Sequence, residues 1–145
     1  MIKVARLLLA FLLLTYAKAD ANDSCRILLN KRVIFKGEVE QQNAVAFLTA
    51  SQLKKTDLIT LEYYSEDDVK GWSRTFYLDA ANDKTLKTIQ LNKQSGSVCF
   101  NAFALKKMIQ NREPVFIYTT SLPKDKKMAA RIRVRSIFVC KIEWN

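Results

Sequence analysis

Apolar and polar residues alternate along three segments of the chain, and this two-residue period is typical of half-buried β-strands. The three segments are residues 58–64, 72–79 and 130–144. In the first of them, Ile59, Leu61 and Tyr63 fall on one face of the expected strand. Strands that are apolar on one face only are typical of antiparallel sheets packed on a core. The pattern therefore predicts a fold built mainly from β-strands.

The N-terminal part of the domain is predicted to form a β-hairpin that turns at Asn30 and Lys31. Apolar residues flank this turn on both sides, which makes residues 27–29 and 33–35 its two arms. The turn lacks the glycine that two-residue hairpin turns favour. Further short strands are expected at residues 85–91, 97–100 and 115–120.

A second hairpin is predicted to join residues 58–64 to residues 72–79. The residues that would share its outward face are Thr60, Glu62, Tyr64, Ser73, Thr75 and Tyr77. Of these, Tyr64, Thr75 and Tyr77 are a candidate face for stacking on a sugar or peptide. The alternative is that Thr and Tyr stand there as good strand formers without a ligand. Arg74 falls on the inward face, where it must reach an acid or the rim because an unpaired buried charge is costly.

The period changes from two to about three and a half residues after residue 100. Asn101 is a good helix N-cap, and Pro114 ends the run. The apolar face of the expected helix contains Ala104, Leu105, Met108 and Ile109. One short amphipathic helix at about residues 101–111 follows. Many strands, one helix and no βαβ rhythm predict an antiparallel β-sandwich or open barrel.

Residues 1–19 have the three-part pattern of a secretory signal peptide. A basic start precedes an apolar run at residues 7–14, and small residues stand at positions −3 and −1 of a cut before Asp20. A cut after Ala21 fits the same rule. The apolar run is shorter than the ~20 residues of a membrane-spanning helix. We therefore expect an exported protein, periplasmic or secreted, with a single domain at residues 20–145.

The sequence excludes several kinds of chemistry. It contains no histidine, which removes the commonest general base and the commonest metal ligand. It has three scattered glycines and no phosphate-binding loop. Cys25, Cys99 and Cys140 allow at most one disulfide, and an internal bridge and three unpaired thiols are equally compatible with the sequence. Cys140 is expected on the apolar face of the last strand. We expect no catalytic residues, no metal and no cofactor.

Arg131, Arg133 and Arg135 occupy alternate positions of the predicted last strand, at residues 130–144. A period of two places their guanidinium groups on one face, at intervals of about 6 to 7 Å. The preceding loop adds Lys124, Lys126 and Lys127. Guanidinium groups suit phosphate and carboxylate partners. The alternative is that the charges guard an edge strand against pairing with another molecule.

The formal net charge of +10 favours anionic partners, such as anionic lipid or acidic glycan. The sequence thus predicts a non-enzymatic binding or scaffolding module at the cell envelope or outside the cell. An envelope protein is a further candidate partner. Specific nucleic acid recognition is not expected, nor is a transmembrane anchor after signal cleavage. The alternative is a small secreted enzyme that uses carboxylate, Lys or Tyr chemistry, for which a deep pocket with two converging ionisable groups would be the sign.

Overall fold

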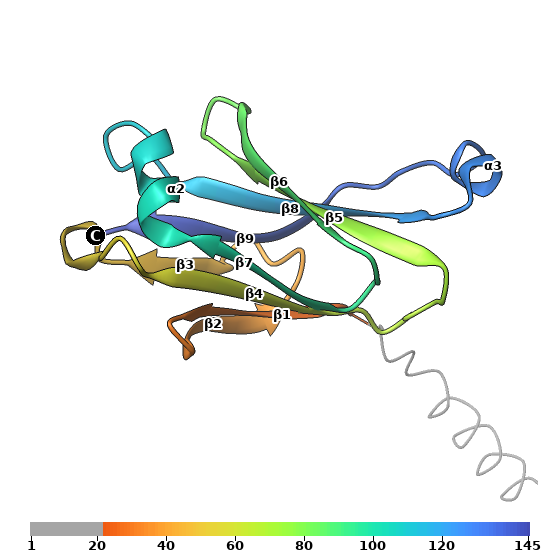
Figure 1. The fold of residues 1–145 in the computed structure, drawn as a ribbon, viewed down its shortest axis with the longest axis horizontal. Coiled ribbons are helices and arrows are strands. Elements are labelled where there is room, and N and C mark those ends of the chain that lie inside the picture. The colour runs from red at the N-terminus through yellow and green to blue at the C-terminus, as the bar shows by residue number, and fades with distance from the viewer. Residues whose placement is uncertain (1–21) are drawn as a thin grey trace, which may run out of the picture.

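The computed structural model describes residues 22–145, so the expected signal peptide at residues 1–19 lies outside the described residues. Two β-sheets pack face to face (Figure 1). The four-stranded sheet has the order β2-β1-β4-β7, with β1 Ser24–Leu29, β2 Arg32–Glu38, β4 Leu58–Tyr64 and β7 Gly96–Asn101. The five-stranded sheet has the order β3-β9-β8-β5-β6, with β3 Val45–Leu48, β5 Trp72–Asp79, β6 Thr85–Leu91, β8 Val115–Pro123 and β9 Ile137–Trp144. The predicted mainly β, sandwich-like fold is confirmed.

Neighbouring strands are antiparallel in every pair except one, because the edge strand β3 runs parallel to β9. Three short helices complete the described chain, namely η1 Ala50–Gln52, α2 Ala102–Met108 and α3 Lys126–Ala129. Figure 1 shows α2 and the C-terminus at one end of the sandwich and α3 at the other.

The predicted hairpin between the second pair of strands is wrong. β4 pairs with β1 and β7, whereas β5 pairs with β6 and β8 in the other sheet. The ring of Tyr63 on β4 meets that of Phe76 on β5 edge-on across the core, with 5.7 Å between their centroids. The alternation in each strand indicates which of its residues face the core, but it does not show whether the next strand lies beside it in the same sheet or opposite it in the other sheet. The connection at residues 65–71 crosses between the sheets.

The inward faces of both sheets form one core. Ile59 and Leu61 of β4 and Phe76 and Leu78 of β5 have no exposed surface. The other side chains buried to this degree are those of Ile27, Ala46, Ala102, Val115, Ile117, Thr119, Val139, Cys140 and Ile142. The burial of Cys140 confirms its predicted place on the inward face of the last strand, whereas Val134, which was predicted to point inward too, is exposed.

The turn of the first hairpin works without glycine. Asn30 and Lys31 both have positive φ, 47° and 71°, the conformation that hairpin turns of this length require. The Asn30 side chain accepts a hydrogen bond from Leu58 N at 3.0 Å and donates one to Asp57 Oδ1 at 2.9 Å. Asp57 also accepts from Lys54 N, and these hydrogen bonds lower its pKa. Side-chain bonds thus hold the conformation that glycine would adopt freely.

The helix α2 begins as predicted, because the Asn101 side chain accepts from Ala104 N at 2.7 Å. Its buried face differs from the prediction. Ala102, Leu105 and Ile109 are buried, whereas Ala104 and Met108 are exposed. The prediction assumed a helix that continues past Ile109, but the helix ends at Met108 and Ile109 is extended.

The predicted last strand starts seven residues later than expected, at Ile137 instead of Ala130. Its ladder with β8 ends at the pair Thr119–Ile137, and the preceding residues have no strand partner. The alternation of Arg with Ile and Val before this point therefore reflects no strand.

Candidate functional site

The six predicted anion-binding residues lie together in the excursion between β8 and β9, which we call the basic arm (residues 124–135). Asp125 caps α3 by accepting a hydrogen bond from Met128 N at 2.8 Å. The six basic side chains are all exposed and are those of Lys124, Lys126, Lys127, Arg131, Arg133 and Arg135. The predicted ladder of arginines on a strand face is wrong, because this segment is a short helix followed by a turn and irregular chain.

The basic arm forms one ion pair within the described residues. Arg135 Nη2 pairs with Glu40 Oε1 at 2.6 Å. Within residues 22–145, none of the other five cations forms an ion pair. The arm contains one acid, Asp125, whose carboxylate is engaged in the helix cap. The arm therefore concentrates unpaired positive charge.

Two apolar side chains of the basic arm are also exposed, Met128 at 53% and Val134 at 46%. The base of the arm is fixed to the sandwich, because Lys124 N donates to Gly71 O at 2.8 Å. Figure 1 shows α3 projecting beyond the end of the sheets. Exposed cations and exposed apolar groups thus occur together on the basic arm.

The predicted face of Tyr64, Thr75 and Tyr77 is divided between the two sheets. Tyr64 lies on the outer face of the four-stranded sheet and is 61% exposed. Thr75 and Tyr77 lie on the outer face of the five-stranded sheet. The three residues therefore do not form one surface, because β4 and β5 are not paired.

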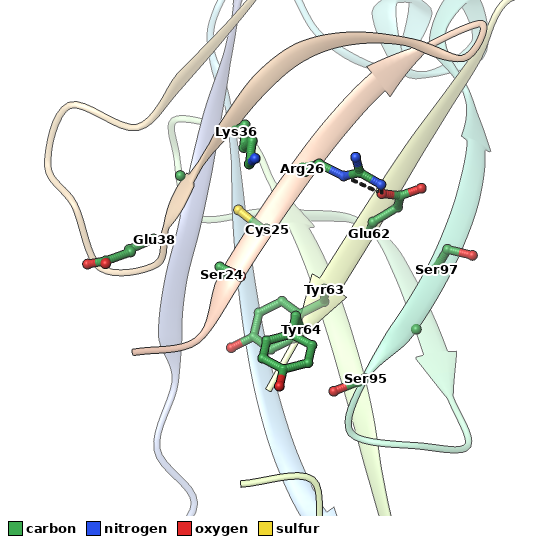
Figure 2. Close-up of a pocket in the computed structure, with 12 residues that line it drawn as sticks. Ser24, Cys25, Arg26, Lys36, Glu38, Glu62, Tyr63, Tyr64, Ser95 and Ser97 are labelled. Carbon is green, nitrogen blue, oxygen red and sulfur yellow. Dashed lines mark hydrogen bonds and ion pairs between the residues drawn. The ribbon is translucent and has the colours of Figure 1, made fainter. Parts of the chain in front are cut away.

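A depression of about 770 Å³ crosses the four-stranded sheet beside Tyr64 (Figure 2). The strand register places Lys36, Arg26, Glu62 and Ser97 in one row across its outer face, from β2 to β7. The adjacent row holds Glu38, Ser24 and Tyr64. Arg26 Nε donates to Glu62 Oε2 at 2.6 Å. The Arg26 and Glu62 side chains are 48% and 34% exposed, so the depression is open to solvent.

Sequence reasoning missed the charged residues of this depression. Arg26, Lys36 and Glu62 are far apart in the chain, and only the pairing of β1 with both β2 and β4 brings them together. The one available signal was that Glu62 and Tyr64 share the outward face of a predicted strand.

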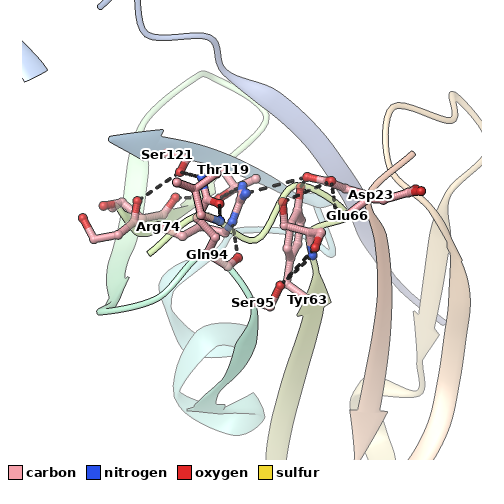
Figure 3. A network of polar contacts seen from close by, with 12 residues as sticks. Asp23, Tyr63, Glu66, Arg74, Gln94, Ser95, Thr119 and Ser121 are labelled. Atoms are coloured by element: carbon pink, nitrogen blue, oxygen red, sulfur yellow. Dashed lines mark hydrogen bonds and ion pairs between the residues drawn. The ribbon is translucent and has the colours of Figure 1, made fainter. Parts of the chain in front are cut away.

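A buried polar network lies behind one side of the depression (Figure 3). At its centre is Arg74, which is 2% exposed. Its Nε donates to Gln94 O at 2.8 Å, its Nη1 donates to Thr119 Oγ1 at 3.4 Å, and its Nη2 lies 3.7 Å from Asp23 Oδ2. The guanidinium also stacks 4.0 Å from the centroid of the Tyr63 ring. Of the two predicted alternatives, an acid or the rim, Arg74 reaches an acid.

The Asp23 carboxylate ties three segments of the chain together. It accepts hydrogen bonds from Tyr63 Oη at 2.6 Å, Ser65 Oγ at 3.3 Å and Glu66 N at 3.2 Å. Burial, with the bond to Asp23, raises the pKa of the Tyr63 phenol. Burial lowers the pKa of Arg74, which Tyr63 and Asp23 partly offset. Because each charge has partners, the network fixes structure and offers no free reactive group.

All three thiols are unpaired in the structure. Cys25 and Cys140 are buried, and Cys99 is exposed on β7. Burial raises the pKa of Cys25 to about 12 and also raises the pKa of Cys140. Buried thiols with raised pKa values are poor nucleophiles and pack as small apolar groups.

Residues 22–145 contain no group of three or more Cys, Asp or Glu side chains placed to hold a metal ion. Nor does this part of the chain contain a helix long and apolar enough to cross a membrane. No protein-family model matches the sequence, and no curated protein matches it. Function must therefore be inferred from the surfaces described above.

Proposed function

We propose that the protein is an exported, non-enzymatic binding module that docks on anionic lipid surfaces through the basic arm. The observation that carries this proposal is the exposure, on the basic arm, of two apolar side chains and of five cations that have no ion-pair partner within residues 22–145. Each Lys or Arg near an anionic bilayer contributes about 1 kcal/mol, and this attraction falls off within the screening length of the salt.

The apolar side chains favour lipid over an acidic glycan as the source of the anionic groups. Met128 and Val134 are about half exposed, and burial of such side chains in the interface of a bilayer removes apolar surface from water. A polysaccharide offers only the small C–H faces of its sugar rings and no apolar interior into which these side chains could insert. Attraction of the cations to anionic lipid and insertion of the apolar side chains are each weak. Together they give a stable association with the membrane.

Vesicle binding tests the proposal. We expect the protein to sediment with phosphatidylcholine vesicles that contain phosphatidylglycerol, to bind pure phosphatidylcholine much more weakly, and to be released by salt. The variant R131Q/R133Q should lose about tenfold or more in affinity, since two cations near the surface are removed. The control K84Q/K87Q removes two exposed lysines at β6 and should bind like the parent protein.

Equal binding by the R131Q/R133Q variant and its parent would reject the arm as the docking site. Binding to heparin without binding to phosphatidylglycerol vesicles would instead favour an acidic glycan and reject the lipid proposal.

Export is the second part of the proposal, and it rests on the expected signal peptide. A cut before Asp20 or Asn22 would leave the anchoring residue Asp23 in the mature chain, where its carboxylate holds the Tyr63 hydroxyl. Mass spectrometry of the protein isolated from outside the cytoplasm should find Asp20, or Asn22, as the first residue. An intact chain beginning at Met1 in the membrane fraction would contradict export with cleavage.

A further inference from the structure

The depression on the four-stranded sheet is separate from the basic arm and differs from it in charge. Its charged side chains are two cations, Arg26 and Lys36, and two carboxylates, Glu38 and Glu62. Lys36 and Arg26 are neighbours across β2 and β1, and Arg26 is paired with Glu62 on β4. A surface with this balance favours neither a polyanion nor a polycation.

The depression offers both kinds of hydrogen-bonding group. Carboxylates accept, guanidinium and ammonium groups donate, and serine hydroxyls do both. The hydroxyls come from Ser24, Ser95 and Ser97. A sugar hydroxyl both donates and accepts, so adjacent hydroxyls of one ring match a carboxylate beside a guanidinium. The volume, about 770 Å³, lies within the range of small-ligand sites.

An exposed aromatic ring completes the depression. Tyr64 is 61% exposed beside Ser24, its neighbour across the strand pair (Figure 2). A tyrosine has an apolar face and a polar tip, which suits it to contacts with ligands that are partly apolar and partly wet. The apolar C–H face of a pyranose ring is such a ligand.

The buried network holds this part of the depression rigid. Tyr63 and Ser65, on either side of Tyr64, are both bonded to Asp23. Ser65 N also donates a hydrogen bond to Ser95 Oγ at 2.8 Å, which fixes the backbone that follows Tyr64. The backbone that carries Tyr64 is thus fixed before any ligand arrives, which reduces the entropy lost on binding.

From these observations we propose that the depression is a binding site for a neutral oligosaccharide chain that lies across the four strands, with one sugar ring on Tyr64 and its hydroxyls on Arg26 and Glu62. A polyanionic glycan is disfavoured by Glu38 and Glu62. The site is independent of the docking function proposed for the basic arm.

Titration calorimetry with four neutral probes tests this site, namely the hexasaccharides of the cellulose, xylan, chitin and starch series. At least one should bind the parent protein. Tyr64→Ala should weaken that binding by about tenfold or more, the loss typical of an aromatic anchor. Tyr77→Ala is the matched control, because it removes the same side chain from the outer face of the other sheet and should change nothing.

Glu62→Gln provides a second test that leaves the fold intact, since an exposed ion pair contributes little to stability. It should weaken binding by removing a strong acceptor, while the thermal unfolding midpoint stays close to that of the parent. Failure of all four probes to bind would overturn the proposal, as would equal binding by Tyr64→Ala and its parent. Binding of an extended peptide at Tyr64 in place of a sugar would also overturn it.

Discussion

The protein uses arginine in two opposite ways, and the contrast between Arg74 and the arginines of the basic arm separates what holds the fold from what is free to bind. Arg74 is almost fully buried and is satisfied by a carbonyl, a hydroxyl, a carboxylate and an aromatic ring. Arg131 and Arg133 are exposed and have no ion-pair partner within residues 22–145. The residue type is the same, and the environment decides its role.

A buried guanidinium is costly to desolvate, so its partners are needed for stability. An exposed guanidinium keeps its hydration and contributes little to the fold, so its charge remains available to an external anion. Substitutions at the two places should therefore have separable effects on unfolding and on binding.

The largest effect is expected for Arg74→Met, which keeps the side-chain stem and removes the charge. It leaves Gln94 O, Thr119 Oγ1 and the Asp23 carboxylate without their cation. Loss of one partner from a buried charged pair costs about 3 to 5 kcal/mol of the free energy of unfolding. Equilibrium urea denaturation measures it. A loss below about 1 kcal/mol would mean that the network is not the stabilising centre inferred from its burial.

The second prediction concerns alkaline pH. The thiols of Cys25 and Cys140 keep their protons in the folded protein above pH 9.0, the ordinary pKa at which the unfolded chain loses them. Above this pH the folded state binds more protons, so the free energy of unfolding falls as pH rises, by about 1.4 kcal/mol per pH unit for each thiol.

Urea denaturation at a series of pH values below and above 9.0 measures how steeply the free energy of unfolding falls with pH. The variant C25A/C140A should reduce the slope between pH 9.0 and 10.0, below the ordinary pKa of the Tyr63 phenol, whereas Cys99→Ser, which changes an exposed thiol, should leave the slope unchanged. An identical slope in C25A/C140A and the parent would assign the alkaline loss to other groups.

The hairpin, the strand faces and the buried Cys140 could be predicted from the sequence because they depend on local period and on turn residues such as Asn30. The placement of β4 and β5 in different sheets could not be predicted. The alternation around Ile59 and around Phe76 would be the same if the two strands shared one sheet. The row of Lys36, Arg26 and Glu62 could not be predicted either, because these residues become neighbours only through the register of β1 with β2 and β4.

The basic arm was the opposite case. Its six cations stand close together in the sequence, so a basic segment could be recognised there, but the alternation of Arg131, Ile132, Arg133 and Val134 imitates a strand. Period alone cannot show that the chain does not pair with β8 beyond the Thr119–Ile137 pair.

The smallest effect on stability is expected for Glu40→Gln, which removes the acidic partner of Arg135. The two side chains are 45% and 73% exposed, so the free energy of unfolding should change by less than about 1 kcal/mol. The released cation should tighten binding to phosphatidylglycerol vesicles by up to about fivefold, corresponding to the ~1 kcal/mol of one charge near a bilayer. Weaker vesicle binding by this variant would show that Glu40 positions the arm for docking.

A fluorescent reporter on the basic arm tests the central claim most directly. The variant V134C, made with Cys99→Ser so that the exposed native thiol does not react, is labelled with a polarity-sensitive dye. The same dye on K84C/C99S, at the turn before β6, serves as the reference. We predict that phosphatidylglycerol vesicles shift the emission at position 134 to shorter wavelength, that high salt reverses the shift, and that position 84 does not respond. No shift at position 134, or an equal shift at position 84, would contradict docking through the basic arm.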